Sequence, residues 1–150
     1  MMWMNRMLVV SIILWCGAGQ AAQVTEEFLD ALEHIESNGD PNAIGDSGRA
    51  VGSMQCWKIY VAEANRILHL PVFGPEDRRD RAASREMTRT VLSHWSAYHE
   101  RHGRTVGLSE LCSLHRMPNA AWRPSRMLTK HEQNRTKKLL HFIKISRDKL

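Results

Sequence analysis

The sequence predicts a mainly α-helical protein with about five helices and one small loop or hairpin region. Apolar residues recur at three- and four-residue spacing in several segments, which is the pattern of helices that bury one face. Segments rich in glycine and proline separate these stretches. The chain has 150 residues, of which 43% are hydrophobic and 25% are charged, as is usual for one globular domain.

The first helix is expected over residues 25–38. Thr25 is a favourable N-cap residue, and the apolar residues that follow it fall on one helical face. Gly39 is expected to end this helix, because glycine is common directly after the last helical residue.

Residues 40–53 predict a loop. Three glycines and a proline in this segment exclude a long helix. A tight turn or short hairpin is expected around Asp46, Ser47 and Gly48, since these residue types favour turns.

The remaining helices are expected over residues 57–68 and 76–102, from near Ser109, and from Thr129 towards the end of the chain. At the last of these, Thr129 and Glu132 have the spacing of a capping box.

The first 22 residues predict a secretory signal peptide. A start with one positive charge is followed by an apolar run over residues 7–16 and then by small residues up to Ala22. The alternative, a membrane anchor, is disfavoured because a spanning helix needs about 20 apolar residues. We therefore expect cleavage after Ala21 or Ala22 and export to the periplasm or the extracellular space, without stable membrane insertion of the mature protein.

The chain is basic. The formal net charge is +5, and loss of Arg6 with the signal peptide lowers it to +4. A basic surface suits an anionic cell wall. It would also suit nucleic acid or a membrane surface, with the basic tail over residues 123–149 as the contact, but export argues against nucleic acid. We expect a monomer that binds no nucleic acid.

Two cysteines remain in the mature chain, Cys56 and Cys112. They are expected either to form a disulfide, as an oxidising compartment allows, or to be two buried free thiols. No set of cysteines and histidines has the spacing of a zinc site, so no metal or cofactor is expected.

The residue that indicates chemistry is Glu36. It follows Leu32 by four positions and Leu29 by seven, so all three side chains lie on one side of the first helix, near its end. Burial beside leucines and the negative end of the helix dipole both disfavour the carboxylate anion. A glycosidase needs a carboxylic acid that is still protonated when it meets the glycosidic oxygen. The alternative is a surface glutamate at a frayed helix end.

The residues around Glu36 form a longer motif. Glu36-Ser37 is followed by a Pro-Asn-Ala-x-Gly segment over residues 41–45 and by a Gly-x-Met-Gln segment over residues 52–55. Together these resemble the first motif of lytic transglycosylases of the soluble type and of their goose-lysozyme-like relatives. The resemblance implies a lysozyme-like fold for residues 23–150, with Glu36 as the single catalytic acid and base. It also implies that Ser37 and the loop residues contact the substrate. These loop residues are Ser53, Met54 and Gln55.

The resemblance also implies a reaction. In this family one glutamate protonates the glycosidic oxygen between N-acetylmuramic acid and N-acetylglucosamine, and then takes the proton of the muramic 6-hydroxyl as an anhydro ring closes. A lysozyme-type hydrolase is the alternative and would need a second carboxylate. Asp40 and Asp46 are the candidates near Glu36 in sequence.

The second motif of the family is altered in this chain. His115 and Trp122 keep the expected separation, but Arg116 and Met117 replace an asparagine and a glycine. His115, Trp122 and, after a local shift, Asn119 are expected to bind substrate. The alternatives are a loop histidine bonded to backbone, a tryptophan packed in the core, and a protein that binds peptidoglycan without cutting it.

Overall fold

The computed structural model describes residues 24–119 and 129–148. The expected signal peptide and Trp122 lie outside these residues. Among the described residues the chain is mainly helical, with five α-helices, two 3-10 turns and one two-stranded sheet. The α-helices are α1 (Glu26–Ser37), α2 (Lys58–Leu68), α3 (Arg81–Arg101), α4 (Leu108–Arg116) and α5 (Lys130–Arg147).

Helix α1 begins at the predicted cap and ends one residue earlier than predicted, at Ser37. The hydroxyl of Thr25 accepts a hydrogen bond of 3.2 Å from the backbone N–H of Phe28, which caps the first turn. Asn38 follows the helix in the left-handed conformation with a φ of 57°, and Gly39 continues with a φ of 81°.

The expected hairpin is present beside the end of α1. Strands β1 (Ile44–Gly45) and β2 (Ala50–Val51) pair antiparallel, with Ile44 opposite Val51. The turn η1 (Asp46–Gly48) joins them, as the turn-forming residues of this segment predict.

Two helices begin at residues other than those predicted. Helix α3 starts at Arg81, because the 3-10 turn η2 (Pro75–Arg78) precedes it. The Asp80 carboxylate caps α3 by accepting a hydrogen bond of 2.7 Å from the N–H of Ala83. Helix α4 is capped at Gly107 and not at Ser109, since the Glu110 carboxylate accepts a hydrogen bond of 3.1 Å from the N–H of Gly107.

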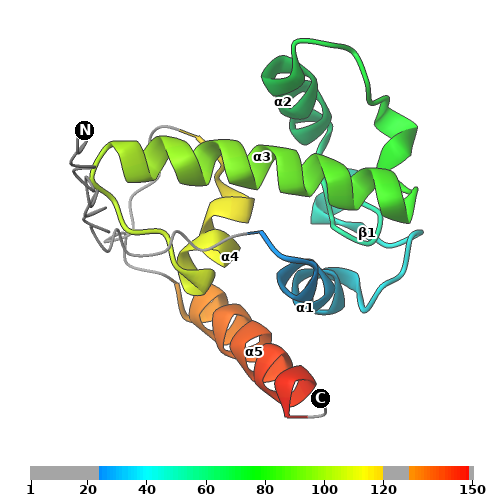
Figure 1. The fold of residues 1–150 in the computed structure, drawn as a ribbon. Coiled ribbons are helices and arrows are strands. Elements are labelled where there is room, and N and C mark those ends of the chain that lie inside the picture. Colours follow the sequence, from blue (N-terminus) through cyan, green and yellow to red (C-terminus); the bar gives the residue numbers. More distant parts are fainter. Residues whose placement is uncertain (1–23, 120–128, 149–150) are drawn as a thin grey trace, which may run out of the picture.

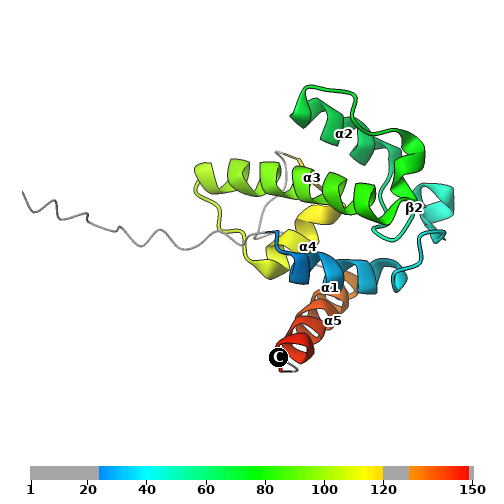
Figure 2. The ribbon, with the colours of Figure 1, turned by 45° about the vertical axis from the view of Figure 1, so that its right-hand side comes forward.

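Helix α3 lies in the middle of the molecule. Helix α2 packs along one side of it, α1 and α4 lie on the other side, and α5 packs against α1 and α4 (Figures 1 and 2). The core fills the space between these helices. Its largest fully buried side chains include Phe28, Leu29, Leu32, Met87, Leu92, Leu111, Leu114 and Leu139.

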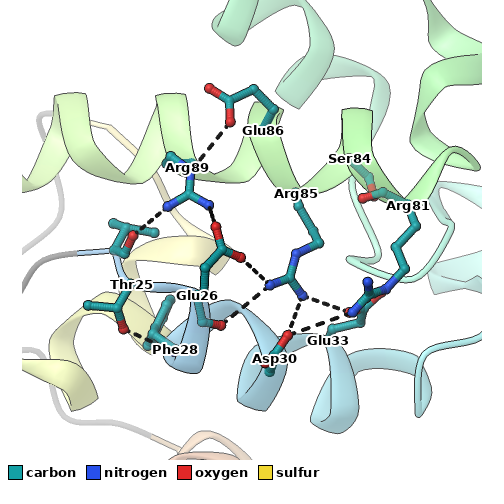
Figure 3. Close-up of polar contacts among 11 residues, drawn as sticks. Thr25, Glu26, Phe28, Asp30, Glu33, Arg81, Ser84, Arg85, Glu86 and Arg89 are labelled. Atoms are coloured by element: carbon teal, nitrogen blue, oxygen red, sulfur yellow. Dashed lines mark hydrogen bonds and ion pairs between the residues drawn. The ribbon is translucent and has the colours of Figure 1, made fainter.

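Ion pairs fix α1 against α3. Three arginines of α3 point towards three acids of α1 (Figure 3). The central pair is Arg85 with Glu33, at 2.9 Å between Nη1 and Oε2, and both side chains are at most 10% exposed. Arg85 also binds Asp30 at 2.8 Å, and Arg81 binds Glu33 at 2.8 Å. Because Glu33 is one turn before Glu36, these contacts hold the end of α1 in place.

No helix in the described part of the chain has the length and apolar character needed to cross a bilayer.

Candidate active site

A cavity of about 510 Å³ opens where the five helices and the hairpin meet. Side chains from every α-helix and from the hairpin line it. The residues of this lining that form the candidate site include Glu36, Gln55, Trp57, Trp95, His115 and Arg135.

Glu36 lies in the last turn of α1, and its side chain is only 8% exposed. It is therefore not a surface residue at a frayed end. Helical spacing predicts apolar neighbours for this carboxyl group, but its nearest charged group is the guanidinium of Arg135, which reaches it from α5. Nε2 of His115 lies 4.0 Å from the same carboxylate oxygen. Nothing in the local pattern around Glu36 indicates either neighbour.

The glycine loop after the hairpin is held close to η2. Gly52 has a φ of 83°, and a Cβ atom on it would lie 1.7 Å from the carbonyl oxygen of Arg78. Only glycine fits, because the left-handed backbone and the close approach both exclude a side chain. The loop therefore turns sharply at Gly52 and directs the Gln55 side chain to the cavity wall.

Gln55 braces the hairpin from the cavity side. Its side-chain amide donates to the carbonyls of Ala43, at 3.2 Å, and of Gly52, at 2.9 Å. The hydroxyl of Ser37 donates a hydrogen bond of 2.7 Å to the carbonyl of Ser53, which ties the end of α1 to the same loop. The motif residues thus shape the wall around Glu36.

The residues predicted to bind substrate fall into two groups, with one residue outside them. Gln55, His115 and Asn119 line the cavity together with Glu36. Ser53 and Met54 are 1% and 0% exposed, and they and Ser37 support the loop from behind. The residue outside these groups, Trp122, lies beyond the described residues.

His115 lies in the last turn of α4 and is only 7% exposed. Its Nε2 is 3.1 Å from the carbonyl oxygen of Met54, so Nε2 carries a hydrogen and donates it. Nδ1 then accepts from the hydroxyl of Tyr60 at 3.0 Å. Burial lowers the pKa of His115 even though the nearby Glu36 carboxylate acts in the opposite direction. His115 is thus a neutral bridge whose two ring nitrogens are both used within the protein.

Two tryptophans that were not predicted as site residues line the cavity. Trp57 is 37% exposed and donates from Nε1 to the Asp46 carboxylate at 3.1 Å. Trp95 donates from Nε1 to the Glu63 carboxylate at 2.8 Å. These hydrogen bonds fix both indole rings at the cavity wall. The guanidinium of Arg49 lies over the Trp57 ring, 4.4 Å from its centroid, so at most the opposite face of this indole can stack on a sugar ring. The position of Trp57 directly after the motif loop is the signal that could have indicated it.

The two candidate second carboxylates differ in position. Asp46 lines the cavity, although it also belongs to the turn between the strands. Asp40 instead accepts a hydrogen bond of 2.8 Å from the N–H of Asn42 in an exposed turn.

The wall formed by residues 117–119 is anchored to α3. His99 is fully buried, and its Nε2 lies 2.8 Å from the carbonyl oxygen of Asn119. A guanidinium nitrogen of Arg104 lies 2.5 Å from the other ring nitrogen of His99. Because an arginine can only donate, Nδ1 of His99 accepts from Arg104, and Nε2 of His99 donates to the carbonyl of Asn119.

Cys56 and Cys112 are buried free thiols. Burial raises the pKa of Cys56 to about 12 and that of Cys112 to about 11. Of the two alternatives, the structure thus contains the pair of free thiols. Among the side chains that the structure describes, those of residues 24–119, 129–130 and 133–148, no three histidines, cysteines, aspartates or glutamates gather into a metal-binding group.

Comparisons of the chain with models of protein families, with curated proteins and with solved structures found no match.

Proposed function

We propose that the protein is a peptidoglycan-cleaving lytic transglycosylase with a lysozyme-like fold over residues 23–150. The observation that carries this proposal is the position of Glu36. It is a nearly buried carboxyl group at the end of α1, on the wall of a cavity that is also bordered by the Gly-x-Met-Gln loop. A carboxyl group on the wall of a cavity is the kind of residue that an acid catalyst of glycoside cleavage needs.

In the proposed reaction Glu36 is the only group that transfers protons. Its carboxylic acid protonates the glycosidic oxygen between N-acetylmuramic acid and N-acetylglucosamine, and the bond from that oxygen to C1 breaks. The muramic 6-hydroxyl then attacks C1, and its proton returns to Glu36. Water is not consumed, so a second carboxylate is unnecessary.

The cavity wall supports a glycan as the substrate. Trp57 and Trp95 present indole rings there, and hydrogen bonds to Asp46 and Glu63 fix these rings. Stacking of sugar rings on such aromatic faces, together with polar groups such as Gln55, is a common way to bind carbohydrate.

The proposal includes the place of action. Residues 1–22 act as a signal peptide, and the mature protein, with a net charge of +4, meets the anionic cell wall after export. Its partner is the glycan strand of peptidoglycan, and it needs no cofactor.

Release of soluble fragments from purified sacculi tests the proposal. The parent should release fragments, and Glu36→Gln should lose release by at least about a hundredfold, because acid catalysis typically contributes about a hundred- to ten-thousandfold. The variant should still bind sacculi in a pull-down. Release by Glu36→Gln at the parental rate would contradict the proposal.

A lysozyme-type hydrolase is the second candidate, because Asp46 lines the same cavity as Glu36. A hydrolase would use Asp46 to position water or to stabilise the positive charge on the sugar. Asp46→Asn would then abolish cleavage, whereas a transglycosylase should keep its chemistry and lose only the support that Asp46 gives to Trp57.

A protein that only binds peptidoglycan is the third possibility, and Arg116 and Met117 on the cavity wall favour it. In that case the parent binds sacculi and releases nothing. Arg116→Asn combined with Met117→Gly, which restores the family pattern, is then the variant expected to gain activity.

A further inference from the structure

The contact between Arg135 and Glu36 leaves part of the guanidinium unused. The Arg135 side chain lines the cavity and is 17% exposed. Its Nη2 contacts the Glu36 carboxylate as an ion pair. Its buried Nε has no hydrogen-bond partner among the described residues, and Nη2 has none beyond this contact. Buried donors are normally satisfied, so this guanidinium has hydrogen-bonding capacity that no described residue uses.

The same contact opposes acid catalysis. An ion pair is made by the carboxylate and not by the carboxylic acid, yet the first step of the proposed reaction needs a proton on Glu36. Glu36 can therefore act as an acid only after another anion has taken its place at the Arg135 guanidinium. The other cavity carboxylates are engaged, Asp46 with Trp57 and Glu63 with both Arg66 and Trp95.

We propose that Arg135 binds a carboxylate of the glycan substrate and, by doing so, releases Glu36 to act as an acid. This inference rests on the proposed function. N-acetylmuramic acid carries a lactyl carboxyl group on the sugar ring whose C1 bond is cut. That group is a free carboxylate where the stem peptide has been removed and an amide where the peptide is attached. The stem peptide itself is a second source of carboxylates.

The steps balance without another reactant. The substrate carboxylate takes the place of Glu36 at the guanidinium, and Glu36 then takes a proton from solvent. That proton passes to the glycosidic oxygen as the bond breaks, and the 6-hydroxyl proton replaces it. When the product leaves, Glu36 gives this proton back to solvent and pairs with Arg135 again.

Binding of two matched tetrasaccharides by calorimetry tests this inference separately from cleavage. One tetrasaccharide alternates N-acetylglucosamine and N-acetylmuramic acid with free lactyl carboxylates, and the other has these groups converted to methylamides. All variants are made in the Glu36→Gln background, because this protein does not cleave and has no buried carboxylate at position 36 that would be left unpaired when Arg135 is changed. Glu36→Gln itself should bind the carboxylate form about ten- to a hundredfold more tightly, as expected for a charge-assisted hydrogen bond.

Two double variants locate the effect. Glu36→Gln with Arg135→Gln should bind both tetrasaccharides equally, and Glu36→Gln with Arg135→Lys should keep part of the preference because the charge remains. Glu36→Gln with Arg116→Gln is the matched control, because Arg116 lines the same cavity and its loss removes the same charge. This control should keep the preference. Thermal melts establish that each variant is folded.

The outcomes separate this inference from the proposed function. Equal binding of the two tetrasaccharides by Glu36→Gln overturns the role of Arg135 and leaves the proposed function standing. Loss of the preference in the Arg116 control as complete as in the Arg135 variant also overturns it, because net positive charge then explains the preference. Absence of binding to either sugar contradicts the proposed function as well. A peptide-bearing tetrasaccharide that binds as tightly as the free carboxylate form supports Arg135 as the receptor and identifies the stem peptide as the source.

Discussion

The hydroxyl of Tyr60 and Nδ1 of His115 lie 3.0 Å apart, and both side chains are almost completely buried in the wall of the cavity that Glu36 lines. The hydroxyl donates to a neutral imidazole, whose other nitrogen donates to the carbonyl of Met54. This chain of hydrogen bonds connects α2, α4 and the loop of the first motif. His115 therefore positions the wall around Glu36 and has no ring nitrogen left for substrate.

The first prediction concerns stability in mild acid. Burial lowers the pKa of His115 below its ordinary value of 6.5, so just below pH 6.5 the unfolded chain takes a proton that the folded protein does not. Stability should thus fall as the pH drops from 6.5 towards the folded pKa, and the loss should stop below it. Thermal melts of the parent and of His115→Gln between pH 7.5 and pH 5 measure this. The variant should show a shallower fall, and parallel curves would contradict the neutral bridge.

The second prediction concerns the turn at Gly52. Gly52→Ala adds a Cβ 1.7 Å from the carbonyl oxygen of Arg78 and strains a backbone with a φ of 83°. It should lower the free energy of unfolding by about 3 kcal/mol or more. Gly48→Ala is the matched control, because Gly48 has a φ of 89° but no atom within 4 Å of the added Cβ. The control should lose only about 1 to 2 kcal/mol in urea unfolding, and equal losses would contradict the close approach.

The third prediction concerns the ion pairs between α1 and α3. Arg85→Met removes one ion-pair partner of the Glu33 carboxylate. Because the Glu33 side chain is only 4% exposed, water replaces this partner poorly. The free energy of unfolding should fall by about 3 kcal/mol. Arg79→Gln breaks an exposed pair with Glu76 and should change stability by at most about 1 kcal/mol. Similar losses in both variants, measured by urea unfolding, would contradict the burial of the Arg85 pair.

The fourth prediction concerns the thiols. Because Cys56 and Cys112 are free and burial raises the pKa of both, they should react slowly with iodoacetamide at neutral pH. Peptide mapping should find both alkylated only after denaturation, and a reductant should leave the melting temperature unchanged. A drop in melting temperature on reduction would indicate a disulfide.

Local features of the fold could be predicted from the sequence. The cap at Thr25 and the turn around Asp46 depend on neighbouring residues, and the structure has both. The end of α1 comes one residue earlier than predicted, because Asn38 and not Gly39 takes the first left-handed position. The start of α3 was predicted too early, because the charged residues that follow Pro75 form the 3-10 turn η2 and Asp80 caps the helix.

The site could be predicted only in part. The motif indicated Glu36 and Gln55 at one cavity, but Arg135 approaches Glu36 from α5, far along the chain. Such a contact depends on how α5 packs on α1, and no spacing rule encodes it. The assignment of His115 to a substrate-facing loop came from the resemblance to the family motif, whereas in the structure this residue lies in the last turn of α4 and bonds to Tyr60.

The most direct measurement is mass spectrometry of the fragments released from sacculi in water enriched in heavy oxygen. The account predicts that the parent releases muramic fragments one water molecule lighter than hydrolysis products and without heavy oxygen, because the 6-hydroxyl and not water attacks C1. Glu36→Gln should release none of them. Fragments that carry heavy oxygen at the muramic C1, or unlabelled anhydro fragments formed by Glu36→Gln at the parental rate, would contradict the account.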